Sequence, residues 1–337
     1  MARRALGPAA LQVVQAVRQV LAGERRPVVV ACSGGADSMA LACAVAHLAR
    51  RGCQHATASA AVIDHGLQPA SSEVAAEVAN RLNEIGLAVT TRRVNVAADS
   101  PDGMEAAARD ARYAALAEVA GAEAVVLLGH TLDDQAETVL LGLARGSGTR
   151  SLAGMPAQFG RSPQFIRPLL GLRRTTTAQA CGEWGAEVWS DPQNDDPTFT
   201  RVRVRQRVLP MLETELGPGI TEALARTATM ARQDADALDG LADSLVPAAG
   251  EAGYGAGLAA ASLRTMPEAI ASRVLRRWLV DGGVDQPSYA HVQAVKALVD
   301  DWHGQLGVDL PGGIRVLREA GTLVLGRTPH AVGLGED

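Results

Sequence analysis

The 337-residue chain has few cysteines and few aromatic side chains. The first shortage limits the kinds of site it can contain, and the second limits the kinds of fold. The four cysteines are Cys32, Cys43, Cys53 and Cys181, and no two of them form a C-x-x-C pair. This pattern argues against a zinc site, an iron–sulfur cluster or a redox pair. Aromatic residues make up only 3% of the chain, and alanine and glycine are abundant. Helices packed through small side chains are therefore expected, rather than an aromatic-rich sandwich.

Long apolar runs are also missing from the chain. No stretch reaches the ~18 consecutive apolar residues of a transmembrane helix. The basic N-terminus, Met1 to Arg4, leads into a polar-spaced helical pattern and not into the apolar core of a signal peptide. Together with the unpaired cysteines, this predicts a protein of the reducing cytoplasm without a membrane partner.

The net charge of −5 initially argues against a nucleic-acid partner, but the charges are unevenly distributed. Residues 145–207 contain 10 arginines and 5 acidic side chains, whereas residues 216–337 contain 10 basic and 15 acidic side chains. An anionic ligand would therefore meet the middle of the chain first. Solvated, arginine-rich helix faces are the alternative that charge alone leaves open.

Short apolar runs alternate with helical patterns over the first 144 residues. The runs predict strands over residues 27–33, 57–63, 87–94 and 124–128. The patterns between and after them predict helices over residues 39–49, 72–85, 104–120 and 133–144. This alternation predicts an α/β fold, a doubly wound parallel sheet with helices on both faces and ligands at the carboxyl ends of its strands.

The remaining chain is predicted to be mainly helical. Residues 175–185 and 199–216 have helical patterns, and Pro210 is expected to kink or divide the second. Gly217-Pro218-Gly219 is the best linker, which predicts one domain over residues 1–216 and a smaller, mostly helical module over residues 217–337. That module is predicted to contain three helices and a small β-hairpin, over residues 220–245, 266–281, 289–302 and 308–325.

The string Ser33-Gly34-Gly35-Ala36-Asp37-Ser38 lies between the first predicted strand and its helix. Two glycines and successive backbone amides at a helix N-terminus suit a phosphate or pyrophosphate. Beside a polyphosphate, Asp37 is predicted to hold Mg²⁺. The Walker A pattern is absent and Lys296 is the only lysine, so the chain is not a P-loop NTPase. A tight turn without a ligand is the alternative, which the full string disfavours.

Polar strings also follow the second and fourth predicted strands. Asp64-His65-Gly66-Leu67 stands where a side chain can contact a nucleotide. Gly129-His130 opens the other string, in which Asp134 and Glu137 share a helix face and are predicted to hold a cation such as an ammonium group. Capping of the helix is the alternative for these two carboxylates.

Arginines form the remaining candidate groups. Arg112 shares a helix face with Glu105 and Arg109, and a surface ion-pair ladder is the alternative there. In the later string, Arg201 and Arg205 share one face, and Arg203 and Arg207 share another. Guanidinium groups suit the phosphates of RNA or ATP. Arg273, Arg276 and Arg277 form a second patch, for which a solvated face with local ion pairs is the alternative.

Together, these strings resemble the tRNA(Ile)-lysidine synthase family of N-type PP-loop ATP-pyrophosphatases. The resemblance runs from about Arg26 to Leu212 and is weaker over the later helices and Leu310-Pro311-Gly312-Gly313. Besides the strings above, it rests on Arg145-Gly146-Ser147-Gly148, Leu152-Ala153-Gly154-Met155, Arg167-Pro168-Leu169-Leu170 and Asp191-Pro192 with Asn194. It implies an adenine nucleotide hydrolase-like fold that cleaves ATP to AMP and pyrophosphate.

The resemblance also implies a reaction and its partners. ATP, with Mg²⁺, would adenylate C2 of the wobble cytidine in a tRNA(Ile) with a CAU anticodon, and free L-lysine would then replace AMP to form lysidine. A homodimer is compatible with the resemblance. Two alternatives stay open at this point. A tRNA thiolase generally needs paired cysteines, which this chain lacks, and a non-catalytic adenine-nucleotide binding module would not need so many charged residues at the strand ends.

The resemblance assigns roles to individual residues. The implied ATP-binding residues are Ser33, Gly34, Gly35, Ala36, Asp37, Ser38, Asp64, His65, Gly129 and His130. The implied catalytic residues are Asp37, which would hold Mg²⁺, Arg112, Asp134 and Glu137, and the last two would also bind lysine. The implied tRNA-binding residues are Arg145, Arg201, Arg203, Arg205, Arg276 and Arg277.

The chain departs from the family pattern at three positions. Gln68 stands where the family usually has arginine, Val202 where it usually has asparagine, and Thr131 where a second histidine is common. The first two departures put individual RNA contacts in doubt and leave the ATP site unaffected. The extra C-terminal domain of longer members is also expected to be missing.

Overall fold

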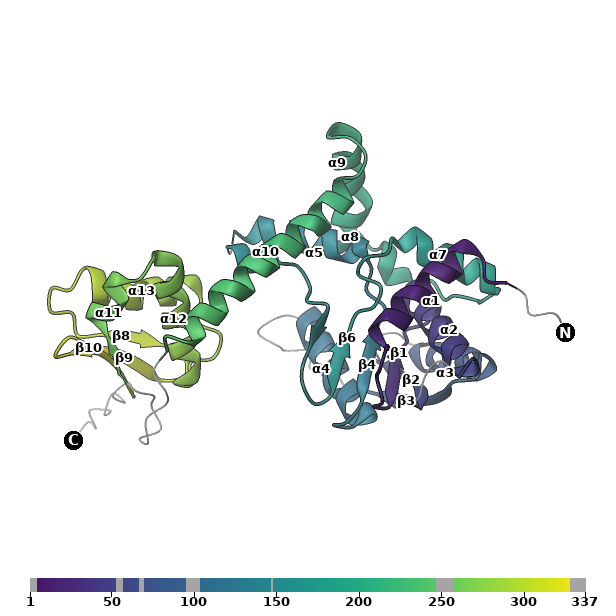
Figure 1. Cartoon of the computed structure of the whole chain (residues 1–337), viewed down its shortest axis with the longest axis horizontal. Helices are drawn as coiled ribbons and strands as arrows, with labels where there is room; N and C mark the ends of the chain where they lie inside the picture. Colours follow the sequence, from purple (N-terminus) through teal and green to yellow (C-terminus); the bar gives the residue numbers. More distant parts are fainter. Residues whose placement is uncertain are drawn as a thin grey trace, which may run out of the picture. The chain divides into compact units, whose positions relative to one another are not determined.

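The computed structural model describes residues 5–52, 57–66, 70–94, 104–146, 148–246 and 257–327 (Figure 1). It contains two compact units that divide between Thr229 and Met230. The division lies inside helix α10 (Ile220–Asp243), so one helix contributes to both units. The functional boundary predicted after residue 216 stays a prediction.

The first unit is built on a six-stranded sheet with the strand order β3-β2-β1-β4-β6-β5. β1 pairs in parallel with both β2 and β4, and β5 is the antiparallel strand at one edge. The strand order therefore reverses between β1 and β4, the position at which such sheets bind ligands. The strands are β1 (Val28–Ala31), β2 (Ala58–Asp64), β3 (Ala88–Arg93), β4 (Val125–Leu128), β5 (Gln158–Phe159) and β6 (Gln164–Ile166).

Helices cover both faces of this sheet, as predicted. Val28 and Val30 of β1 face a core shared with α1, α2, α3 and α7, whereas Val29 and Ala31 face a core shared with α4. The alternation follows from the two-residue period of a strand that is buried on both faces. The helices are α1 (Pro8–Val20), α2 (Ala36–Arg50), α3 (Ser71–Glu84), α4 (Met104–Ala120), α5 (Leu132–Arg145), α6 (Thr149–Leu152) and α7 (Arg174–Trp184).

The predicted helix over residues 199–216 is interrupted by a change of helix type. A 3₁₀ turn, η1 (Pro192–Asp195), precedes α8 (Thr200–Arg203), a π-helical segment η2 (Val204–Val208) and α9 (Leu209–Glu215). Pro210 is the second residue after the π-helical segment. Because proline has no N–H to donate, the hydrogen-bond pattern must change near it, and here the helix widens where a kink or break was expected.

The second unit contains helices packed on a four-stranded antiparallel sheet, in the order β7-β10-β9-β8. Trp278, Leu298, Val316 and Leu323 lie in its core. The predicted hairpin is thus part of a larger sheet. Strand β7 was not predicted, because its two residues are too few to give a periodic signal. The elements are β7 (Leu258–Ala259), α11 (Ala260–Thr265), α12 (Glu268–Asp281), α13 (Tyr289–Asp300), β8 (Val308–Leu310), β9 (Ile314–Glu319) and β10 (Thr322–Arg327).

Across the part of the chain that the structure describes, no helix combines the length and the apolarity that crossing a membrane requires.

Candidate functional site

The loop between β1 and α2 is shaped by a hydroxyl and a glycine. The Ser38 hydroxyl donates to the Gly35 carbonyl oxygen at 2.9 Å and accepts from the Ser33 backbone N–H at 3.2 Å. Gly34 has a φ of +87°, and a Cβ at this position would lie 2.5 Å from Val78 Cγ2. Both its backbone conformation and its close neighbour therefore require glycine at position 34.

Gly35 has neither of these constraints. Its φ is −69°, and an added Cβ would meet only the Ser33 hydroxyl within 4 Å among the described residues, at 3.9 Å. The residue lies at the N-terminus of the 15-residue helix α2. Since neither backbone nor neighbours require a glycine here, the open space next to the first amides of the helix suits an anion.

A cavity of about 150 Å³ opens beside this loop, at the carboxyl ends of β1 and β2. Most of its walls are apolar side chains from β2, α3 and α4. The polar groups in the lining include Ser33, Asp64, His65 and Arg112. An apolar cavity with a few convergent polar groups is typical of a small-molecule site.

Arg112 and His65 line this cavity with unsatisfied hydrogen-bonding capacity. Arg112 is half-buried, burial lowers its pKa, and it forms no hydrogen bond or ion pair with any described residue. His65 Nδ1 is buried and also lacks a hydrogen-bond partner within the described ranges. Burial, and then the Arg112 charge, lower the pKa of His65. A partly buried cation without a carboxylate attracts an anionic ligand.

Asp64 is held by the loop that it precedes. Burial opposes its ionised form, but the hydroxyls of Ser71 and Ser72 and the Gly66 N–H hold its pKa below the usual value. Its oxygens accept from the Gly66 N–H at 2.9 Å and the Ser72 hydroxyl at 2.7 Å. Asp64 therefore orders the wall of the cavity.

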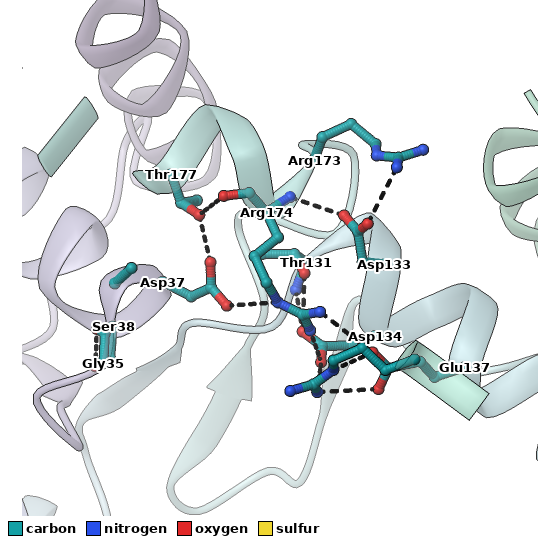
Figure 2. A network of polar contacts seen from close by, with 12 residues as sticks. Gly35, Asp37, Ser38, Thr131, Asp133, Asp134, Glu137, Arg173, Arg174 and Thr177 are labelled. Atoms are coloured by element: carbon teal, nitrogen blue, oxygen red, sulfur yellow. Dashed lines mark hydrogen bonds and ion pairs between the residues drawn. The ribbon is translucent and has the colours of Figure 1, made fainter. Parts of the chain in front are cut away.

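A cluster of carboxylates and arginines lies at the carboxyl ends of β1 and β4 (Figure 2). Arg174, the first residue of α7, connects three of the carboxylates. Its Nη2 is 2.7 Å from Asp134 Oδ1, its Nη1 3.2 Å from Glu137 Oε1, and its Nε 3.4 Å from Asp37 Oδ2. Its backbone N–H donates to Asp133 at 2.7 Å. One guanidinium group therefore joins the start of α2 to the start of α5.

Glu137 is the most enclosed member of this cluster, with 0% of its surface exposed. Besides Arg174, it accepts from Arg201 Nε at 2.9 Å and from Arg205 Nε at 2.7 Å. Both arginines were predicted to contact tRNA. In this structure their partly exposed side chains contact the buried carboxylate of Glu137.

The remaining two predicted carboxylates differ in their electrostatics. Asp134 Oδ2 accepts from the Thr131 backbone N–H at 2.8 Å, which caps α5, so the capping alternative holds for one of its oxygens. Burial opposes ionisation of Asp134, but Arg174 and this N–H hold its pKa below the usual value. For Asp37, burial dominates and raises the pKa, although Thr177 and Arg174 contact the carboxyl group.

His130 interacts electrostatically with Arg112 of the cavity and with Asp134 of the cluster. It follows Gly129, where a Cβ would lie 3.0 Å from the backbone of Asp37 and Ser38. The end of β4 therefore packs directly against the first turn of α2. Burial lowers the pKa of His130 to about 3, so its ring is neutral near pH 7.

The other predicted tRNA-binding arginines lie outside this cluster. Arg145 is exposed in the last turn of α5, and Arg203 donates to the carbonyl oxygens of Pro197 and Thr198, both at 2.7 Å. On α12, Arg276 donates to the Pro287 carbonyl, and Arg277 pairs with Asp281 at 3.1 Å. A local ion pair, the alternative named for the second patch, thus exists at Arg277, whereas Arg203 and Arg276 are held by backbone carbonyl oxygens. Of the family departures, Val202 is 6% exposed, and Gln68 lies outside the described residues.

The sequence did not predict the roles of Arg174 and Thr177. Their contacts with Asp37 join residues 137 and 140 positions apart, which no local spacing can reveal. Arg167 carried a signal, because it opens the Arg167-Pro168-Leu169-Leu170 string. Its contact with His130 was nevertheless not expected.

Comparisons with known proteins agree with this geometry. The family model described as "PP-loop domain" matches residues 9–212, and "TilS substrate binding domain" matches residues 258–324. A tRNA(Ile)-lysidine synthase of Thermobifida fusca is 49% identical, over 92% of this chain and 94% of the relative. Those of Cutibacterium acnes and Leifsonia xyli are 48% and 50% identical, over 97% and 90% of this chain and 99% and 90% of the relatives.

A solved structure supports the fold. A U34-tRNA thiolase from Methanococcus maripaludis superimposes with a TM-score of 0.52 at 16% sequence identity, over 67% of this chain and 80% of the thiolase. At this identity, the similarity extends to the architecture of the sheet and its helices.

Proposed function

The chain belongs to the tRNA(Ile)-lysidine synthase family, and on that basis we propose that it uses ATP to couple free lysine to the wobble cytidine of a tRNA(Ile) with a CAU anticodon. The structural observation that carries this proposal is the juxtaposition of an open PP-loop with a cavity lined by the unpaired Arg112. A thiolase is not favoured, because the chain has no C-x-x-C pair.

The chemistry proceeds in two steps that preserve atoms and charge. In the first, the C2 oxygen of cytosine attacks the α-phosphorus of ATP, and the bond to the pyrophosphate breaks. In the second, the neutral ε-amine of lysine attacks C2, the C2–O bond breaks, AMP leaves with the bond's electron pair, and the attacking nitrogen releases one proton to water. Adenylation is needed because the carbonyl of cytosine is a poor electrophile with a poor leaving group.

The PP-loop and Arg112 would act in the first step. Amides at the start of α2, beside Gly35, and the hydroxyl groups of Ser33 and Ser38 suit the leaving pyrophosphate. Arg112 would offset the charge that develops on the α-phosphate, in a cavity where water screens it poorly. The apolar lining beside His65 suits the adenine and ribose.

Magnesium is proposed to bind at Asp37. Mg²⁺ usually takes one or two protein carboxylates and completes its shell with phosphate oxygens and water. One carboxylate beside the PP-loop fits that requirement, and no group of three or more metal-binding side chains occurs in the described part of the chain. When bound, the ion would neutralise charge on the polyphosphate.

Asp134 and Glu137 are proposed to bind the lysine substrate. Support comes from their position beside Asp37 and their partnership with Arg174, which shows that the cluster accommodates a cationic group. A lysine ammonium group would have to replace part of that guanidinium contact, since Glu137 is fully buried. Lysine binding therefore requires an exchange of cations within the cluster.

The tRNA is proposed to bind through arginine patches, in the cytoplasm, where tRNA and ATP coexist. Anticodon-loop bases are single-stranded, so a base can enter a pocket without opening a duplex. Arg145 and Arg203 lie outside the buried cluster and, with Arg276 and Arg277, are the candidates for phosphate contacts. A homodimer stays a prediction.

One incubation tests the proposed function. The protein is mixed with a tRNA(Ile) transcript carrying a CAU anticodon, ATP, Mg²⁺ and radiolabelled lysine. We expect lysine in the tRNA and equal amounts of AMP and pyrophosphate. A tRNA whose wobble base is uridine serves as the control. ADP as the main product, or label in neither RNA, would reject the proposal, and a non-catalytic module would release no pyrophosphate at all.

A further inference from the structure

Arg167 is held by hydrogen bonds and by a cation–π contact. Its Nη1 donates to the Pro156 carbonyl oxygen at 2.6 Å, and its guanidinium lies 4.4 Å from the centre of the Phe159 ring. Its Nη2 is 3.4 Å from the Tyr113 hydroxyl. Phe159 stacks on Phe165, and Tyr113 meets both rings edge-on. Three of the six phenylalanine and tyrosine residues of the chain thus form one aromatic cluster, two members of which contact this buried arginine.

The Nε–H of Arg167 determines which nitrogen of His130 carries the ring proton. Arg167 Nε lies 3.2 Å from His130 Nδ1. A guanidinium group only donates and does not lose its proton in proteins, so Nδ1 must accept with its lone pair. The single ring proton is therefore on Nε2. His130 Nε2 has no hydrogen-bond partner among the residues that the structure describes.

The position of His130 places its Nε2–H donor near the predicted nucleotide site. The residue follows Gly129, which packs against the backbone of Asp37 and Ser38 at the start of α2. We infer that Arg167 is a positioning residue that fixes His130 as a neutral Nε2–H donor toward an anionic oxygen of the nucleotide or of the adenylated base. The inference rests on the proposed function for its ligand, whereas the tautomer itself follows from the contact.

Burial and the neighbouring arginines outweigh Asp134 in their effect on the pKa of His130. Asp134 of α5 favours the imidazolium form, while Arg167, Arg112 of α4 and Arg201 of α8 disfavour it. Burial adds to the effect of the three arginines. His130 therefore cannot act as a general base through Nδ1, and the proton that lysine loses must go to another group.

Nitrogen-15 NMR of the wild-type protein tests the tautomer without any activity measurement. His130 is assigned from the signal that disappears in His130→Asn. We expect a protonated Nε2 and an unprotonated Nδ1, with no titration between pH 8 and pH 5. A proton on Nδ1, or a titration near pH 6.5, would overturn the inference even if the enzyme forms lysidine.

The Arg167→Gln variant tests positioning through the pH profile of pyrophosphate release, measured in one turnover with ATP and tRNA. Without the Arg167 donor and its charge, the neutral ring can carry its proton on either nitrogen, and its pKa rises. We expect release about 10-fold slower at pH 8, part of the ~10²–10³-fold effect of losing one electrostatic donor. The rate should recover as pH falls, since imidazolium always carries Nε2–H.

Controls separate this role from a merely structural one. Tyr113→Phe removes a weaker contact of Arg167 and leaves the Arg167–His130 hydrogen bond, so its pH profile should match the wild type. If Arg167→Gln loses activity equally at all pH values, or loses more on acidification, the positioning role is wrong. If wild-type enzyme releases no pyrophosphate, the proposed function fails, and the NMR result still decides the tautomer.

Discussion

The segments that follow β1 and β4 present opposite electrostatic arrangements to a ligand. After β1, glycines and helix amides leave open space beside Gly35, and the nearby Arg112 has no carboxylate among the described residues. After β4, the acidic side chains are already paired with arginines, and Glu137 is fully buried. The first region is thus prepared for an anion before it arrives. The second must exchange an internal cation for the cation of a substrate.

Substitutions at Gly34 and Gly35 are expected to have the largest effects, the first on folding stability and the second on activity. Gly35→Val should reduce pyrophosphate release to background while the melting temperature stays near that of the wild type, because its side chain fills only the space next to the helix amides. Gly34→Ala is the matched variant. It should cost about 1–3 kcal/mol of folding stability, because position 34 combines a positive φ with a close neighbour. A destabilised Gly35→Val would contradict this division.

Arg112→Gln should have the next largest effect. Loss of the unpaired charge in the cavity should lower kcat/KM for ATP by about 100-fold, the range seen when one preorganised electrostatic donor is removed. The protein should remain folded, since no described partner is left behind. Arg109→Gln, on an exposed position of the same helix, is the control and should stay within about twofold of wild type. Equal losses in both variants would remove the special role of Arg112.

Glu137→Gln should affect the second region through stability and lysine binding. Three guanidinium groups would lose their buried negative partner, which should lower the free energy of unfolding by about 3 kcal/mol in a urea titration. This value is at the low end for breaking a buried ion pair, because the arginines stay partly exposed. The KM for lysine should rise about 10-fold, a loss of about 1.4 kcal/mol in binding. An unchanged lysine requirement would return this carboxylate to a purely structural role.

The smallest effect is expected outside both regions. Arg276→Ala combined with Arg277→Ala should weaken tRNA binding and flatten its salt dependence by at most about two units of log–log slope. Arg276 and Arg277 already have local partners, so less than the full change is expected. ATP binding should not change. An unaltered slope would confine the RNA contacts to residues 145–207.

Sequence patterns predicted the parts of the molecule that depend on local periodicity. The first four strands and most helices lie close to their expected positions, and the string beginning at Ser33 forms the loop between β1 and α2. Strands β5, β6 and β7 were missed because two or three residues give no period. Helical spacing correctly placed Arg201 and Arg205 on one face. It could not identify their partner, Glu137, because that contact joins segments more than 60 residues apart.

A single-turnover experiment without lysine tests the central claim, that the two regions serve separate steps. Enzyme in excess over tRNA is mixed with ATP, and pyrophosphate is followed in wild type, Arg112→Gln and Glu137→Gln at a temperature where all three are folded. Lysine is then added at a concentration below its wild-type KM, and the initial rate of its incorporation is measured. The account predicts a full pyrophosphate burst but little lysine incorporation for Glu137→Gln, and a lost burst for Arg112→Gln. A burst that falls equally in both variants would contradict it.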